Sequence, residues 1–219
     1  GTGRAERNVA QDLRGTLEAF KRGHYPALGS DQIPEFLEKL EKNEARLFPQ
    51  TIRATKILML TFVRTSELIN ATWGELDLKK GVWEIPATRM KMRRPHTVPL
   101  SKQVLELLKE QKEETKVLKA DWVFPSQVTP KKPMSNGTIL GAIKRLGYRG
   151  EMTGHGFRAL AMSTIKERLG YRHEVVDRQL AHGHRNSIDA AYDRAPFIKE
   201  RTKMMQEWAD YIDGLREGK

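Results

Sequence analysis

Two histidines, an arginine and a tyrosine follow one another at short intervals in the last third of the sequence. His155 and Arg158 are three residues apart, His182 stands in a Leu-Ala-His run, and Tyr192 comes ten residues after that histidine. A phenol can attack a phosphodiester when cations stabilise the charge on the phosphate and a base accepts the phenol proton. These residue types therefore supply the groups needed for phosphoryl transfer through a tyrosine.

The spacing of His155 and Arg158 places both side chains on one face of a helix predicted over residues 154–169. They stand near its N-terminus, where unpaired N–H groups and the helix dipole favour an anion. One interpretation is a phosphate pocket. The alternative is two surface side chains that happen to be neighbours.

Arg64 and Glu67 have the same spacing directly after an apolar segment. The carboxylate can hold the guanidinium in one orientation, and an oriented guanidinium can bind two phosphate oxygens at once. The alternative is a routine ion pair within one helix.

Four cations, Arg89, Lys91, Arg93 and Arg94, fall in the connection between two predicted strands. We expect a β-hairpin that projects a basic tip. The simplest interpretation of all four is a solvated, DNA-contacting run of charge. A single lysine of such a tip can also reach into a groove and deliver a proton.

The remaining candidates have structural alternatives. Tyr192 ends a short helix predicted over residues 187–192, and a lone tyrosine usually serves packing. His182 can be a helix C-cap or a loop residue, because Gly183 suits a helix end there, and His184 competes with it for any role.

Hydrophobic periodicity predicts an α+β fold that is mainly α-helical, with one small antiparallel sheet. Ser30 or Asp31 is expected to cap the first helix, with Pro34 in its first turn, and Ser135 to cap a later one. The segment 51–63 is predicted to be a central buried helix. Strands are expected at 75–78, 82–85 and 97–100, and further helices at 102–115, 135–146, 154–169, 173–181, 187–192 and 197–215.

Composition restricts the class of protein. The 219 residues carry a formal net charge of +11, which favours a polyanionic partner such as nucleic acid. With no cysteine, disulfides and thiolate chemistry are excluded. The longest apolar run, residues 57–63, is far shorter than the roughly 20 residues that cross a bilayer, so we expect no membrane association.

Taken in order, these motifs resemble the catalytic domain of the tyrosine recombinases, the phage integrase family. The resemblance spans residues 30–208. Segments 89–96, 98–101 and 190–194 are similar to integrases that insert prophages and genomic islands. The family often has glycine where this chain has Ala181, and we expect so small a residue to leave the site intact.

The resemblance implies a role for each motif residue and the fold of that catalytic domain. The nucleophile is Tyr192, which forms a covalent 3′-phosphotyrosine; Arg64 and Arg158 clamp the phosphate; Lys91 is the general acid; His155 and His182 assist proton transfer and bind non-bridging oxygens; Glu67 supports Arg64; Arg89, Arg93 and Arg94 contact DNA. With so many cations, we expect neither a metal nor a cofactor.

The family also implies an organisation and partners. Residues 1–28 are expected to be a linker or hinge from an N-terminal DNA-binding domain, and residues 29–219 the catalytic domain. Within it, residues 197–219 form a helix that packs on its own core or on a neighbouring copy. We expect double-stranded DNA attachment sites as substrate, a monomer that forms a homotetramer on DNA, an accessory DNA-bending protein, an excision factor, and a bacterial cytoplasmic location.

Two other functions are open at this stage. A basic DNA-binding module could keep the fold without the chemistry, and a type IB topoisomerase uses a similar pocket to relax DNA alone.

Overall fold

The computed structural model describes residues 26–118, 120–182 and 197–216, so the predicted helix over residues 187–192 and most of the predicted linker lie outside it. The described elements, in chain order, are the 3₁₀ turn η2 (Ser30–Gln32), α1 (Ile33–Lys42), α2 (Pro49–Thr61), α3 (Thr65–Ile69), η3 (Trp73–Glu75), β1 (Leu76–Asp77), β2 (Val82–Ile85), η4 (Ala87–Arg89), β3 (His96–Pro99), α4 (Lys102–Thr115), η5 (Lys116–Leu118), α5 (Gly137–Arg145), α6 (Gly156–Arg168), α7 (His173–Gln179) and α9 (Ile198–Arg216).

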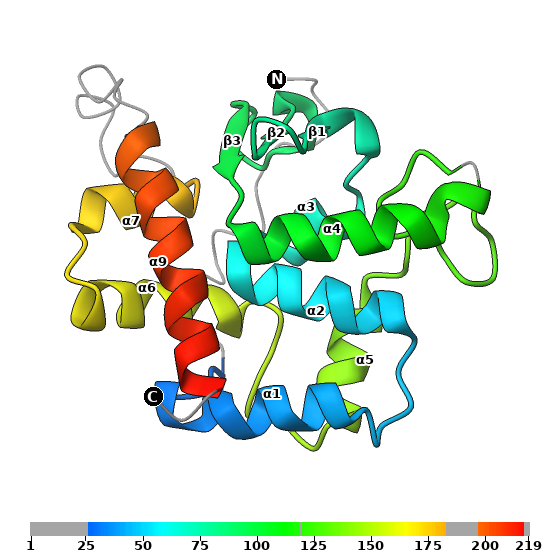
Figure 1. Cartoon of the computed structure of the whole chain (residues 1–219), viewed down its shortest axis with the longest axis horizontal. Coiled ribbons are helices and arrows are strands. Elements are labelled where there is room, and N and C mark those ends of the chain that lie inside the picture. The colour runs from blue at the N-terminus through cyan, green and yellow to red at the C-terminus, as the bar shows by residue number, and fades with distance from the viewer. Residues whose placement is uncertain (1–25, 119, 183–196, 217–219) are drawn as a thin grey trace, which may run out of the picture.

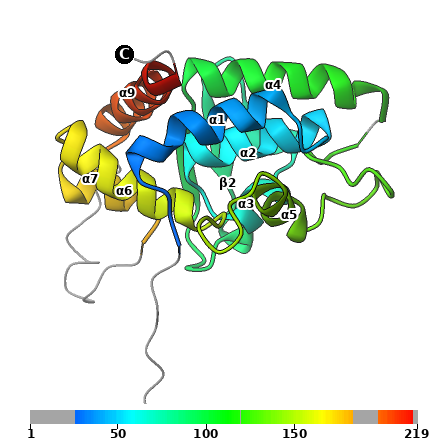
Figure 2. The same cartoon turned by 90° about the horizontal axis from the view of Figure 1, so that it is seen from below.

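Helix α2 is the central element, as the sequence predicts. It contacts α3, α4, α5, α6 and α9, and both views show α1, α2 and α4 running alongside one another (Figures 1 and 2). Two of its threonines can be buried because their hydroxyls bond to the helix itself: Thr55 donates to the Thr51 carbonyl at 2.8 Å and Thr61 to the Ile57 carbonyl at 2.7 Å. The helix ends at Phe62, whose φ is 40°.

The predicted antiparallel sheet is confirmed, with strand order β1-β2-β3. Trp83 pairs with Val98, and Ile85 pairs with His96. Because alternate residues of a strand face opposite sides, Trp83 and Ile85 are buried while Glu84 between them is exposed. The sheet therefore anchors the two ends of the connection that carries Lys91.

Helix α9 packs on the core of its own chain. Met204, Met205, Trp208 and Ile212 are buried, and the Trp208 indole donates to the Met59 carbonyl of α2 at 3.1 Å. Helices α6, α7 and α9 gather at one end of the molecule in both views (Figures 1 and 2). The apolar spacing seen in the sequence thus marks a core-facing side of this helix.

Two predicted helix caps are wrong. Ser30 and Asp31 lie in the turn η2, and Gln32 precedes the first residue of α1. Asn136 precedes α5, and the Ser135 hydroxyl instead lies 2.9 Å from that of Thr138. Hydroxyl and carboxylate side chains favour both caps and tight turns, which explains the confusion. None of the described helices is long and apolar enough to span a membrane.

Candidate active site

Arg158 is buried and tethered on two sides. Its side chain comes from the first turn of α6 and the residue is only 4% exposed. One terminal nitrogen donates to the Phe62 carbonyl at 2.7 Å and the other to the Leu180 carbonyl at 2.6 Å. Burial, followed by the charge of Arg64, lowers the pKa of Arg158 to about 10, so it remains a cation at neutral pH. Each nitrogen keeps a second hydrogen for an anion.

Arg64 is held by Glu67 in two ways. The Glu67 carboxylate accepts from the Arg64 backbone N–H at 2.8 Å and from its guanidinium at 2.6 Å. Arg64 precedes the first residue of α3 in an extended conformation, so the pair spans the start of a helix and is not the ion pair within one helix that was the alternative interpretation. Buried Glu67 fixes both the backbone and the side chain of Arg64, which leaves the guanidinium little freedom.

The two arginines meet at the end of α7. Arg158 donates to the Leu180 carbonyl, and Arg64 points to the next carbonyl, that of Ala181, at 3.4 Å. Helix α7 ends before Ala181, whose φ is 50°, and His182 follows directly. Two arginines that precede these carbonyls by 117 and 22 residues in the sequence are thereby brought to one point, next to the predicted site residue His182.

His182 is oriented by Asp177, a residue that the sequence reasoning missed. The His182 Nδ1 atom lies 2.7 Å from an Asp177 carboxylate oxygen. When Nδ1 is engaged in this way, Nε2 is the nitrogen that can face a ligand. The signal was present in the sequence as an acid five residues before the histidine, on the preceding helix.

His155 caps α6 instead of lying within it, because the helix begins at Gly156. Burial, and then the charges of Arg158, Arg64 and His182, lower the pKa of His155. The ring is therefore neutral at neutral pH and able to accept a proton. The following glycine is required by space, since a Cβ atom on Gly156 would stand 2.4 Å from the Pro26 carbonyl oxygen.

The predicted basic tip is only partly correct. Lys91, Arg93 and Arg94 are exposed on the connection between β2 and β3. Arg89 is not: its side chain is 20% exposed and forms an ion pair with Glu75 at 2.5 Å. The described residues offer Lys91 no hydrogen-bond or ion-pair partner, so the structure does not join Lys91 to the two arginines. Tyr192 and His184 lie outside the described residues.

Arg201 is a second residue that the sequence reasoning missed, and it joins the elements that surround the site. Arg201 of α9 is 2% exposed. Its Nε donates to the Gln179 side chain at 3.0 Å, and one of its terminal nitrogens donates to the Thr97 carbonyl. The His96 ring lies 3.0 Å from the Gln179 carbonyl. This network joins α9, the end of α7 and strand β3. An arginine on an otherwise apolar helix face was the available signal.

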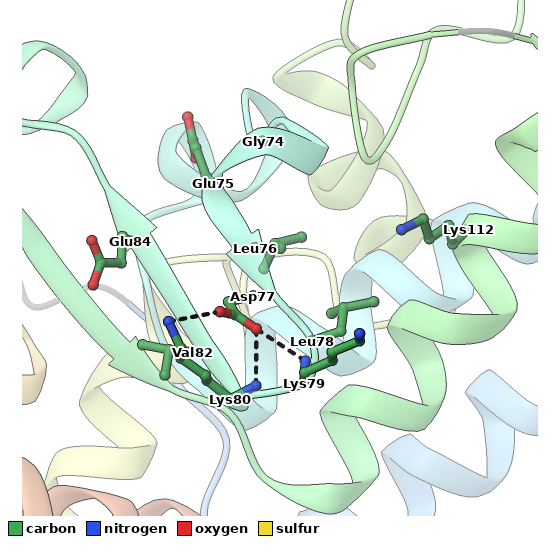
Figure 3. Close-up of a pocket in the computed structure, with 10 residues that line it drawn as sticks. All are labelled: Gly74, Glu75, Leu76, Asp77, Leu78, Lys79, Lys80, Val82, Glu84 and Lys112. Carbon is green, nitrogen blue, oxygen red and sulfur yellow. Dashed lines mark hydrogen bonds and ion pairs between the residues drawn. The ribbon is translucent and has the colours of Figure 1, made fainter.

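A hollow of about 610 Å³ lies over β1 and contains none of the predicted catalytic residues. It is lined by residues 74–80 with Val82, Glu84 and Lys112 (Figure 3). Asp77 there pairs with Lys80 of the adjoining turn. The charges are mixed, so the hollow offers no concentrated field for a phosphate. Among the described residues, no group of histidine and carboxylate side chains could hold a metal ion.

Comparisons with known proteins agree with the resemblance seen in the sequence. Residues 26–198 match the model of the family described as "Phage integrase family". The integrase of Enterobacteria phage P4 is 39% identical over 94% of this chain and 49% of its own length. The prophage integrase IntS of Escherichia coli K12 is 36% identical over 97% of this chain and 54% of its own length. The chain thus spans about half the length of these relatives.

Solved structures share the fold. The Tn1549 transposon integrase in complex with transposon right end DNA aligns with a TM-score of 0.62 and 18% identity, covering 88% of this chain and 69% of that one. XerA recombinase aligns with a TM-score of 0.60 and 18% identity, covering 83% of this chain and 66% of that one. The predicted fold class is confirmed.

Proposed function

Because this chain belongs to the phage integrase family, we propose that it carries the catalytic part of a site-specific DNA recombinase. The enzyme cleaves and rejoins DNA strands through a covalent 3′-phosphotyrosine and thereby integrates or excises a mobile element. Residues 29–219 form its catalytic domain, and residues 1–28 are the hinge from an N-terminal DNA-binding domain.

One observation carries the proposal: two arginines from distant segments converge beside His182. Arg158 is tethered through Leu180 and Arg64 through Ala181 and Glu67. Holding two guanidiniums close together is unfavourable without an anion between them. Tethered cations of this kind, one buried and one half-buried, are preorganised for the charge that develops on a phosphate in the transition state.

In the cleavage step, the Tyr192 phenol oxygen forms a bond to phosphorus as the bond to the 5′ oxygen breaks. Only about one phenol in a thousand is ionised at neutral pH, because a tyrosine pKa is about 10. Neutral His155 accepts the phenol proton. Arg64, Arg158 and the Nε2 side of His182 bind the non-bridging oxygens.

The leaving 5′ oxygen needs a proton, and Lys91 supplies it. In the DNA-bound state the exposed loop of Lys91 brings the ammonium group to this oxygen. The covalent intermediate retains the phosphate ester bond, so a 5′ hydroxyl of another strand can attack it and restore the DNA. This exchange requires no nucleotide cofactor.

The substrate of the intact enzyme is double-stranded DNA at attachment sites, as the basic surface and the DNA-bound relative support. We further propose a homotetramer on DNA formed from monomers, an accessory DNA-bending protein and an excision factor. The bacterial cytoplasm is the proposed location.

A trapping experiment tests the proposal. The intact protein is incubated with a nicked duplex that carries its attachment site, identified from the DNA ends that flank the encoding element. Cleavage next to the nick releases a short fragment, so the covalent complex accumulates and is seen as a shifted band in a denaturing gel. The wild type should form it and Tyr192→Phe should not.

Either of two results would overturn the nucleophile assignment: no adduct with the wild type, or an adduct with Tyr192→Phe. The first result together with tight DNA binding would favour a DNA-binding module without chemistry. Relaxation of supercoiled DNA without recombination of any site pair would favour a topoisomerase.

A further inference from the structure

Arg89 stands apart from the other cations of its connection. Its guanidinium makes an ion pair with Glu75 at 2.5 Å and donates to the Glu67 carbonyl at 3.1 Å. Its Nε is also buried, with no hydrogen-bond partner among the described residues. Withdrawing a charged group from water is costly unless the group is paired and hydrogen-bonded. The contacts with Glu75 and with the Glu67 carbonyl meet this condition and hold the guanidinium on the body of the protein.

Both partners of Arg89 are themselves fixed. The Glu75 carboxylate also accepts from the indole N–H of Trp83, a buried residue of β2, at 3.0 Å. In Figure 3 the Glu75 carboxylate points away from the turn of Asp77 and Lys80. Glu67 is buried and binds Arg64 through its carboxylate. Arg89 is therefore bound to two residues, Glu75 and Glu67, that are themselves held in place.

Glu67 links the two halves of the site. Its carboxylate orients Arg64, and its carbonyl accepts from Arg89. The phosphate clamp and the start of the lysine loop are thus attached to one buried residue. Any shift of this residue would displace both together.

The chain is short and constrained between Arg89 and Lys91. Met90 between them is buried, and its N–H donates to the Ala87 carbonyl at 3.2 Å. The Arg93 N–H then donates to the Met90 carbonyl at 2.9 Å, and the φ of Arg93 is 50°, so Lys91 stands on a tight hydrogen-bonded turn. Consecutive Cα atoms are about 3.8 Å apart, so a fixed Arg89 restricts Lys91 to a small volume.

The loop is also fixed where it returns to the sheet. His96 is buried, and its ring lies 3.0 Å from the Gln179 carbonyl of α7. Between these two anchors Met90 is buried and residues 91–95 are exposed. The loop is therefore exposed over residues 91–95 and held at both ends, which limits how far Lys91 can move.

We propose that Arg89 is a positioning residue for the reaction: paired with Glu75, it holds the lysine loop on the residue that orients Arg64, so that Lys91 reaches the leaving 5′ oxygen. This inference rests on the proposed function. Arg89, which the sequence placed on the DNA-contacting tip, then acts inside the protein. Glu75, which the sequence did not single out, acts as its ion-pair partner.

The test exploits the chemistry of the leaving group. An alcohol leaves poorly without a proton, whereas a thiol, with a pKa of about 8.5, leaves as the anion. A DNA substrate with sulfur in place of the bridging 5′ oxygen at the scissile phosphate does not need the general acid. Loss of acid positioning should therefore slow cleavage of ordinary DNA and not of the sulfur substrate.

Cleavage rates are measured with the intact protein on both substrates for the wild type, Lys91→Ala, Arg89→Met and Glu75→Gln. Positioned acids contribute about 100-fold to 10,000-fold, so displacement of Lys91 in Arg89→Met should cost about 10-fold to 100-fold on ordinary DNA. On the sulfur substrate Arg89→Met and Lys91→Ala should both approach the wild-type rate. Glu75→Gln keeps an acceptor for Trp83 and should show a smaller loss with the same recovery.

Several outcomes are distinguishable. If the wild type cleaves neither substrate, the proposed function fails. If Lys91→Ala recovers on sulfur and Arg89→Met does not, or if Arg89→Met cleaves ordinary DNA normally, the positioning role is wrong. If Lys91→Ala does not recover, there is no acid for Arg89 to position and the inference also fails. If either single variant folds poorly, the double variant Arg89→Met with Glu75→Gln is used instead, because it removes both charges of the pair. It should also cleave ordinary DNA slowly and approach the wild-type rate on the sulfur substrate, and failure to recover there would contradict the proposal.

Discussion

Acid should destabilise this protein through His96, which is buried where the lysine loop rejoins the sheet. The residue is 7% exposed, and its ring lies 3.0 Å from the Gln179 carbonyl. Burial, followed by the charge of Arg201, lowers the pKa of His96 to about 3; the charges of Arg158 and Arg64 act in the same direction. In an unfolded chain a histidine has a pKa of about 6.5. The folded protein therefore keeps this ring neutral where the unfolded chain protonates it.

The sign and the size of the effect follow from this difference. Between about pH 6.5 and the folded pKa of about 3, the unfolded chain binds a proton that the folded protein does not, so stability falls as the pH falls. One pKa unit corresponds to about 1.4 kcal/mol. Since pH 5.0 lies about 1.5 units below the unfolded pKa, His96 should remove about 2 kcal/mol of the free energy of unfolding between pH 7.0 and pH 5.0.

Urea denaturation at the two pH values measures this loss, and a variant isolates the contribution of His96. In His96→Gln an amide can still donate to the Gln179 carbonyl, but it does not titrate. The wild type should lose about 2 kcal/mol more than His96→Gln on going to pH 5.0. A matched control is His173→Gln, because the His173 side chain is 47% exposed; it should retain the acid loss of the wild type.

The reasoning would be refuted if His96→Gln lost as much stability at pH 5.0 as the wild type. His96 would then be protonated in the folded protein or exposed to water. His155, whose pKa is also lowered, adds to the total loss in both proteins, so only the difference between them is informative.

Three further predictions concern the core, the end of α7 and the exposed basic loop. Ala181→Gly should raise the free energy of unfolding by about 0.5 kcal/mol, because its φ of 50° strains alanine by somewhat more than glycine costs in the unfolded chain; a loss of stability in urea would contradict this. Trp208→Ala should cost about 3–5 kcal/mol, since the buried indole packs α9 on α2; a small change in thermal unfolding would mean that α9 is not docked on its own chain. The chain by itself should bind duplex DNA weakly, with a steep dependence on salt, and Arg93→Gln or Arg94→Gln should each lower the slope of log affinity against log salt by about 1. An unchanged slope in fluorescence anisotropy would remove that arginine from the interface.

Local sequence patterns were sufficient for most of the fold. The strand β2 and the helix α4 have the bounds that alternation and helical spacing predict. Periodicity succeeds there because the burial of one face determines the element. Helix starts were less predictable, as Ser30 and Ser135 show, because the same side chains stabilise caps and turns.

The candidate site was also predictable only in part. The types and spacing of these residues suggested a site for phosphoryl transfer, and the resemblance to the integrase family supplied the role expected of each residue. Spacing alone could not show that Arg64 and Arg158 converge on adjacent carbonyls, because contacts across 117 and 22 residues depend on how helices pack.

The four loop cations illustrate the limit most clearly. In the sequence Arg89 and Arg94 are equivalent members of one basic run. Tertiary structure alone separated them, because the packing of η3 and α3 places Glu75 and the Glu67 carbonyl beside Arg89 and leaves Arg94 in solvent. The sequence by itself determined the chemistry that this protein has available. The fold decided which of its charges converge or remain exposed and which are paired inside the protein, because that depends on neighbours that are distant along the chain.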